Sequence, residues 1–180
     1  MSGTVCACVC LTAPGSVEAA VGRAQERIFR DHGILSACAL PPLVPVGFVA
    51  PDEGGAAELL AAVERAVEAP WIAVTGGVVW HEGSLFLSVD WGSTWDRARG
   101  ALASVRPLVE PGPFPVACGF FMGCAEADPA ARSSIAVTTA PLSFSSADIA
   151  FLRVTYERPF GSALSWETVA ERPFRGRRHT

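Results

Sequence analysis

Hydrophobic positions recur along the chain with strand or helix spacing, and glycines and prolines separate the resulting segments. The alternation of residues 4–12 predicts a strand, and Val17, Val21, Ala24 and Ile28 follow helical spacing. Ser16 is expected to cap this helix, and Gly33 stands where its C-terminal cap belongs. The later elements predicted are a strand over 43–50, a helix over 55–69, strands over 71–80 and 84–91, a helix over 93–105, and strands over 115–122, 134–140, 147–157 and 164–171.

Local signals refine several of these elements. Pro45 lacks a backbone donor, so the strand over 43–50 is expected at a sheet edge or at a bulge. The triplet 81–83 (HEG) predicts a hairpin turn, and Ser93 with Asp96 forms a capping-box pattern. Four prolines between 107 and 115 predict an extended connection.

The order β-α-β-α-β-β-α-β-β-β-β predicts an α+β protein of two similar lobes, each a sheet backed by helices. A chain of 180 residues suits one large domain. We expect a single bilobal domain over residues 1–174 and a basic, flexible tail over 175–180.

Composition narrows the range of partners. Half of the residues are hydrophobic and 18% are charged, with a mean hydropathy of +0.33, so a disordered chain is excluded. The formal net charge of −4 favours neither nucleic acid nor an anionic membrane. No apolar run reaches the roughly 18 residues of a membrane span, and the N-terminus does not read as a signal peptide. We therefore expect a cytoplasmic protein; its oligomeric state is left open.

The six cysteines are expected to be reduced thiols. Cys6, Cys8 and Cys10 share one face of the first strand, where one strand alone cannot wrap a tetrahedral ion. Small packing residues are the favoured interpretation, with metal ligation as the alternative. Cys38 and Cys124 are interpreted in the same way, and neither a metal nor a cofactor is predicted.

Two proline-flanked apolar segments and a closing hairpin carry a family resemblance. They are residues 40–48 (LPPLVPVGF), residues 114–120 (FPVACGF), and residues 150–156 followed by 166–170. They are similar to the two catalytic strands, written P-P-H-hydrophobic-T-hydrophobic-G-F and P-H-hydrophobic-T-hydrophobic, and the closing hairpin of the two-histidine (2H) phosphoesterase superfamily, which includes 2'-5' RNA ligase-like proteins. The resemblance covers about residues 4–174. It implies a bilobal α+β fold with two antiparallel sheets and flanking helices around a central cleft.

The resemblance also implies a chemistry that this chain lacks the groups to perform. In the family, one histidine of the paired H-x-T/S motifs acts as general base and the other as general acid on a phosphodiester. The matching positions here are Leu43 and Pro45 in the first motif, and Val116 and Cys118 in the second. Proton transfer near neutral pH needs groups such as imidazole. Phosphodiesterase activity of the family type is therefore not expected.

The three histidines do not restore the motifs. His32 ends a predicted helix, His81 belongs to a hairpin turn, and His179 lies in the tail. None falls on a strand that is predicted to line the cleft.

The cleft that remains is expected to be apolar and to suit a small organic ligand. Its candidate polar or catalytic groups are Cys118, Tyr156 and Arg153. Each also has an ordinary structural interpretation, as a packing thiol, a core tyrosine and a surface arginine. The candidate ligand-binding residues are Leu43, Pro45, Val116, Cys118, Phe86, Phe120 and Trp91.

Three functions are compatible with these features. The favoured one is a 2H-like fold that binds an apolar small molecule in a bacterial biosynthetic pathway, with cyclisation or rearrangement as the candidate reaction. The second is a non-catalytic scaffold or binding protein. The third is a residual RNA or cyclic-nucleotide phosphodiesterase. A filled cleft with an exposed apolar patch elsewhere would favour the second.

Overall fold

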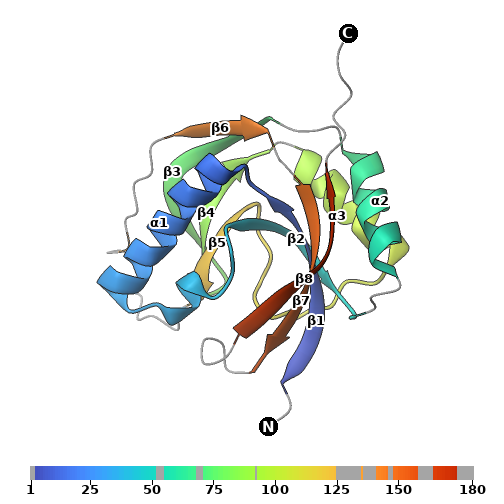
Figure 1. The fold of residues 1–180 in the computed structure, drawn as a ribbon, viewed down its shortest axis with the longest axis horizontal. Helices are drawn as coiled ribbons and strands as arrows, with labels where there is room; N and C mark the ends of the chain where they lie inside the picture. The colour runs from blue at the N-terminus through green and yellow to red at the C-terminus, as the bar shows by residue number, and fades with distance from the viewer. Residues whose placement is uncertain are drawn as a thin grey trace.

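Two four-stranded antiparallel sheets with helices on their outer sides form the protein (Figure 1). A computed structural model describes residues 3–51, 55–67, 71–91, 93–124, 135, 141–145, 148–157 and 164–173. The elements are β1 (Thr4–Thr12), α1 (Gly15–His32), the 3-10 helix η1 (Leu35–Cys38), β2 (Leu43–Val49), α2 (Ala56–Ala66), β3 (Trp71–His81), β4 (Ser84–Asp90), α3 (Thr94–Val105), β5 (Gly119–Cys124), β6 (Leu142–Ser145), β7 (Asp148–Tyr156) and β8 (Leu164–Pro173).

The strand order brings the two motif-bearing strands together. The first sheet has the order β2-β1-β7-β8 and the second β5-β4-β3-β6, so β2 and β5 are both edge strands. These two edges contact each other, although they belong to different sheets. Helix α1 packs against β5, whereas α2 and α3 pack against each other and against the first sheet (Figure 1). The α+β prediction with two antiparallel sheets is confirmed.

The predicted helices are present; Ser16 is not the N-cap of α1, whereas Ser93 does stand at the N-cap position of α3. Helix α1 begins at Gly15, and the carbonyl of Pro14 accepts the first backbone hydrogen bonds in place of the Ser16 hydroxyl. Ser93 precedes α3 without a side-chain capping bond. The C-terminal prediction is confirmed, since Gly33 has φ 69° and donates to the carbonyl of Phe29. That left-handed conformation favours glycine.

Strand β2 occupies the edge position that Pro45 predicted. Pro45 lies opposite Cys10 of β1, and the register shifts between this pair and the next, Val9 with Gly47. A bulge at a sheet edge accommodates a residue that has no N–H to donate. The following strands β3 and β4 form the predicted hairpin, in which Glu82 and Gly83 both have positive φ.

The second motif strand begins later than expected. A strand over 115–122 was predicted, but β5 starts at Gly119, because the prolines keep the preceding residues in an irregular connection. Strand β6 was not predicted. Of the strand expected over 134–140, only Ile135 is among the described residues. The tail over 175–180 lies outside the described residues. The single-domain assignment over 1–174 remains a prediction.

No helix within the described ranges is long and apolar enough to cross a membrane.

Candidate functional site

The faces of the two sheets that point away from the helices share one buried hydrophobic cluster. We call it the inner cluster; its members are Cys6, Cys8, Cys10, Leu40, Leu43, Phe48, Phe86, Phe114, Phe121, Ala150, Leu152, Val154 and Tyr156. Every member is at most 3% exposed. Strand alternation assigns the odd residues of β1, such as Ala7 and Val9, to the helix-side core instead. Side chains of both sheets therefore pack together in the region between the motif strands.

The structure divides the predicted site residues between these two cores. Leu43, Phe86 and Tyr156 belong to the inner cluster, and Val116 packs against it. Pro45 is buried opposite Cys10, an inner-cluster residue. Trp91, Phe120 and Cys118 instead join or contact the helix-side core, so the predicted ligand-binding set does not form one site.

Val116 and Cys118 were both expected to line the cleft, but Cys118 packs against the helix-side core instead. Strand alternation does not hold there, since both residues precede β5. The Cys118 thiol donates to the carbonyl of Val89 at 3.4 Å, and the Val89 N–H donates to the carbonyl of Cys118 at 3.2 Å. Cys118 therefore extends the pairing of β5 with β4 and contacts the helix-side core.

Arg153 and Tyr156 are not neighbours on one face. Arg153 forms an ion pair with Glu167, its partner across β7 and β8, on the face opposite the inner cluster. Tyr156 points into the inner cluster, as does Val154. Alternate residues of β7 point to opposite sides of the sheet, which separates the two candidate polar groups.

Polar side chains from the helices satisfy the free edges of both motif strands. Trp95 Nε1 and Arg99 Nη1 of α3 donate to the carbonyls of Pro45 and Val46, at 3.0 and 3.1 Å. On the other edge, Gln25 Nε2 of α1 donates to the carbonyl of Phe121 at 3.0 Å. These bonds stabilise two edge strands that meet without a shared ladder.

The titratable groups of the inner cluster are the thiols of β1 and the phenol of Tyr156. Burial raises the pKa of Cys6 to about 12, and hydrogen bonding to Cys10 together with burial raises the pKa of Cys8 well above its usual range. Beside the cluster, burial raises the pKa of Cys124 to about 11. Chiefly through burial, the pKa of Cys118 is also raised to about 11. A thiolate nucleophile at neutral pH is disfavoured at these four positions.

Among the described residues, the histidines lie outside the inner cluster. His32 is exposed at the end of α1. His81 is exposed at the β3–β4 hairpin, and its ring lies edge-on to Phe86 with centroids 6.5 Å apart. In the described part of the chain, no group of three or more His, Cys, Asp or Glu side chains is placed to hold a metal ion.

Sequence reasoning missed the aromatic centre of the inner cluster. Phe114 stacks on Phe121 with centroids 4.0 Å apart and an interplanar angle of 24°. Phe114 also meets Phe48 edge-on, with centroids 4.9 Å apart. Phe86 contacts Phe121 from β4 at 5.9 Å. The signal was present in the second motif, where Phe114 precedes the expected histidine position by two residues.

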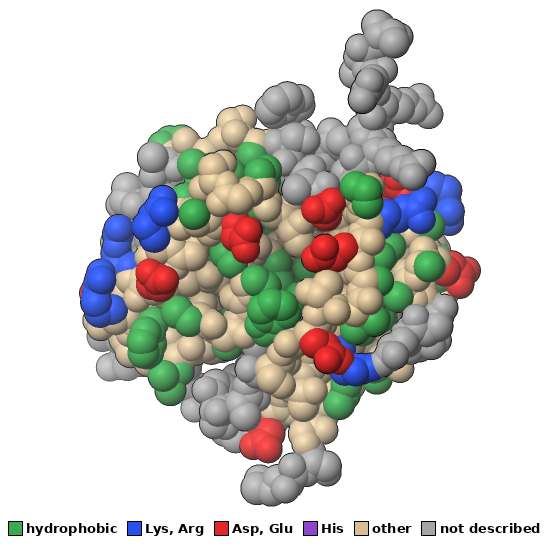
Figure 2. Space-filling model, viewed as in Figure 1, with side chains coloured by type: hydrophobic (Ala, Val, Ile, Leu, Met, Phe, Trp, Pro, Cys, Tyr) green, Lys and Arg blue, Asp and Glu red, His purple; other side chains and the backbone are tan. Residues whose placement is uncertain are grey.

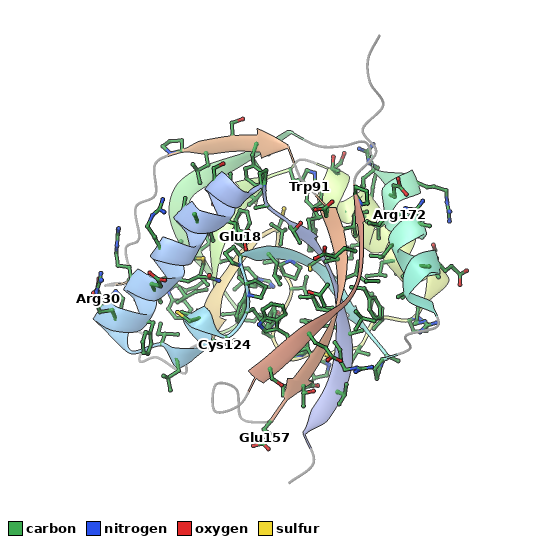
Figure 3. All side chains as sticks on the ribbon, viewed as in Figure 1. Glu18, Arg30, Trp91, Cys124, Glu157 and Arg172 are labelled. Carbon is green, nitrogen blue, oxygen red and sulfur yellow. The ribbon has the colours of Figure 1, made fainter. Side chains whose placement is uncertain are left out.

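Figure 3 labels the side chains of Trp91 and Cys124, which both lie near strand β4. Trp91 follows the end of β4, whereas Cys124 pairs with Ser84 at its beginning, so the two lie at opposite ends of β4. The thiol of Cys124 is 3.2 Å from the Ser84 hydroxyl. The indole N–H of Trp91 is buried and has no hydrogen-bond partner in the structure as described.

The comparisons with known proteins agree with this arrangement at the level of the fold. No protein-family model and no curated protein sequence matches the chain. The structure of TT0787 of Thermus thermophilus is 17% identical, with a TM-score of 0.62 over 96% of this chain and 99% of that chain. E. coli LigT complexed with 3'-AMP is 10% identical, with a TM-score of 0.61 over 97% and 99%. The crystal structure of a phosphoesterase is 10% identical, with a TM-score of 0.54 over 94% and 98%. The chain therefore has the LigT-like fold of the two-histidine phosphoesterases, which its three motif-bearing segments resemble.

Proposed function

We propose that this chain uses the LigT-like fold to bind an apolar small molecule between its two sheets, and that it does not hydrolyse phosphodiesters. The observation that carries the proposal is the composition of the inner cluster. Hydrocarbon and aromatic side chains surround Leu43 at the first motif, and Val116 at the second packs against the same cluster. Apolar walls with few polar groups are typical of sites for small organic molecules.

The acid–base part of the proposal rests on which groups are near the motif positions. Hydrolysis of a phosphodiester needs a base and an acid within hydrogen-bond reach of the reacting atoms. The thiols of Cys6 and Cys8 hold their protons too tightly to act as bases at neutral pH. His81 reaches the cluster only through the ring of Phe86, and one imidazole supplies one of the two groups required.

We expect no turnover of 2',3'-cyclic nucleotides or 2'-5'-linked dinucleotides. The assay compares the purified chain with E. coli LigT, and a His81→Ala variant serves as the matched control. Equal background rates for the wild type and the variant support the proposal. Turnover that scales with protein concentration and disappears in His81→Ala or Cys118→Ala would contradict it, because an acid–base pair would then exist.

A second candidate function, the non-catalytic scaffold, is favoured by two observations: the inner cluster is fully packed, with every member at most 3% exposed, and an exposed apolar surface lies on α1 and η1. Phe29 is 43% exposed and Leu35 is 66% exposed. Arg23, Arg27 and Arg30 are spaced by four and three residues, so they share one exposed side of the helix. Figure 2 shows basic side chains gathered over α1, with hydrophobic side chains below its lower end. Because Arg30 is paired with Asp31 and Glu26 is exposed on the same helix, this surface suits a protein partner with an apolar patch and charges of both signs.

A further inference from the structure

A ring from outside the sheets occupies the space between the two motif strands. Phe114 belongs to the connection from α3 to β5, which we call the strap (residues 106–118). Its ring is 2% exposed and lies between Phe121 of β5 and Phe48 of β2. The aromatic contact that joins the two sheets at this point therefore depends on a residue of the strap.

Backbone hydrogen bonds attach the strap near each of its two ends. Near its beginning, the N–H of Val109 donates to the carbonyl of Phe48 at 2.8 Å, and Glu110 forms an ion pair with Arg99. At its end, Cys118 pairs with Val89. Phe114 lies between these attachments, and its ring packs against Phe48 and Phe121. The Glu110 side chain is 67% exposed, so the ion pair stabilises the strap only modestly.

The neighbours of Phe114 are arranged to receive a flat ring. Phe121 offers a face at 4.0 Å, and Phe48 meets the ring edge-on at an interplanar angle of 87°. Offset stacking and edge-to-face contacts are the two arrangements that aromatic rings favour, whether the ring belongs to the protein or to a ligand. Leu43 and the thiols of β1 add apolar walls to the same cluster.

We propose that the space between Phe48 and Phe121 is a binding subsite for a planar, uncharged aromatic ring, and that Phe114 occupies it until a ligand displaces the strap. This inference rests on the proposed function and names the ligand class for that site. The ligand's ring stacks on Phe121 and meets Phe48 as Phe114 does. The strap separates from β2 at the Val109 bond, and its ends remain attached through α3 and β5.

The test uses benzyl alcohol, with cyclohexylmethanol as the matched non-planar control, and follows the backbone amide signals by NMR. Benzyl alcohol is expected to bind the wild type weakly and to shift the amides of residues 109–118, Phe48 and Phe121. Phe114→Ala is expected to bind it at least about ten-fold more tightly, because removing an internal competitor raises the populated fraction of the open site. Cyclohexylmethanol is expected to bind more weakly to both proteins.

A second variant keeps the test informative if Phe114→Ala does not fold. A β-carbon at Gly112 would lie 2.4 Å from Cδ2 of Phe48, a buried ring that has little room to move. Gly112→Ala should therefore push the strap away from β2 and increase affinity for benzyl alcohol several-fold without removing any core atom.

Two results would overturn the subsite. One is a folded Phe114→Ala or Gly112→Ala protein that binds benzyl alcohol no better than the wild type. The other is a wild-type strap whose amides never shift at saturating probe, which would make Phe114 a permanent core residue. Cyclic-nucleotide turnover, measured on the same preparation, tests the proposed function separately, so failure of one inference is distinguishable from failure of the other.

Discussion

Raising the pH from 8 to 10 under reducing conditions is expected to lower the free energy of unfolding steeply. The pKa of Cys6 in the folded protein is about 12, and those of Cys118 and Cys124 are about 11. A thiol in the unfolded chain titrates near 8.5. Above that pH the unfolded state has lost protons that the folded state still holds, so each such thiol lowers stability by about 1.4 kcal/mol per pH unit until its folded pKa is reached.

The composition of the chain makes the contribution of these thiols to the pH dependence easy to separate from that of other side chains. All 14 basic residues other than the histidines are arginines, and the chain has one tyrosine, so few other side chains titrate between pH 8 and 11. Urea unfolding midpoints at pH 7, 8, 9 and 10 measure the effect. Above pH 9, Cys6→Ala should make the free energy of unfolding fall less steeply with pH, by the equivalent of about one proton. Cys38→Ser, at an exposed site, should change this slope less. A stability that stays constant to pH 10 would show that the buried thiols ionise as easily in the folded protein as in the unfolded one.

Helices and strands were predictable from the sequence wherever the hydrophobic residues kept a single spacing, that of a helix or that of a strand. Strand β1 alternates between the two cores from Cys6 to Leu11, and α1 presents Val17, Val21 and Ile28 on one buried side. Pro45 indicated an edge strand because it removes a ladder donor, and β2 is an edge strand. These features depend on local geometry, which a single sequence records.

The site was predictable only in part because its residues come from an irregular segment. Leu43, which the motif resemblance assigned to the cleft, lies in the inner cluster, but alternation could not be extended through residues 115–118, where no strand forms. Cys118 was consequently assigned to the wrong face. Phe114 reaches the inner cluster through a proline-rich connection whose path depends on contacts with β2 and α3. The course of such an irregular connection leaves no regular spacing of hydrophobic residues from which it could be predicted.

Phe121→Ala is expected to lower the free energy of unfolding by about 3–5 kcal/mol, the usual cost of deleting a fully buried phenylalanine ring. The ring is 1% exposed and contacts Phe86 and Phe114, and its loss would leave a cavity between the two sheets. Urea unfolding measures the change. Phe29→Ala is the matched control, because Phe29 is 43% exposed on α1 and its loss should cost less than about 1 kcal/mol.

Urea unfolding of Phe114→Ala tests whether a phenylalanine carried by the strap contributes less to stability than one carried by a strand. Phe121 is fixed in β5, whose neighbour β4 cannot move to fill a cavity, so the variant bears the full cost. Phe114 is carried by the strap, and under the proposal the strap can separate from β2, so the cost of removing the ring cannot exceed the cost of that opening; we therefore expect Phe114→Ala to cost clearly less than Phe121→Ala. Equal costs would mean that Phe114 packs as rigidly as a sheet residue and would count against its displacement by a ligand. The proposal expects a smaller loss of stability for Phe114→Ala than for Phe121→Ala. It also expects a coupling energy of about 0.5–1.5 kcal/mol between the two substitutions in the double variant, because the ring of Phe114 stacks well on Phe121 but can be displaced from it.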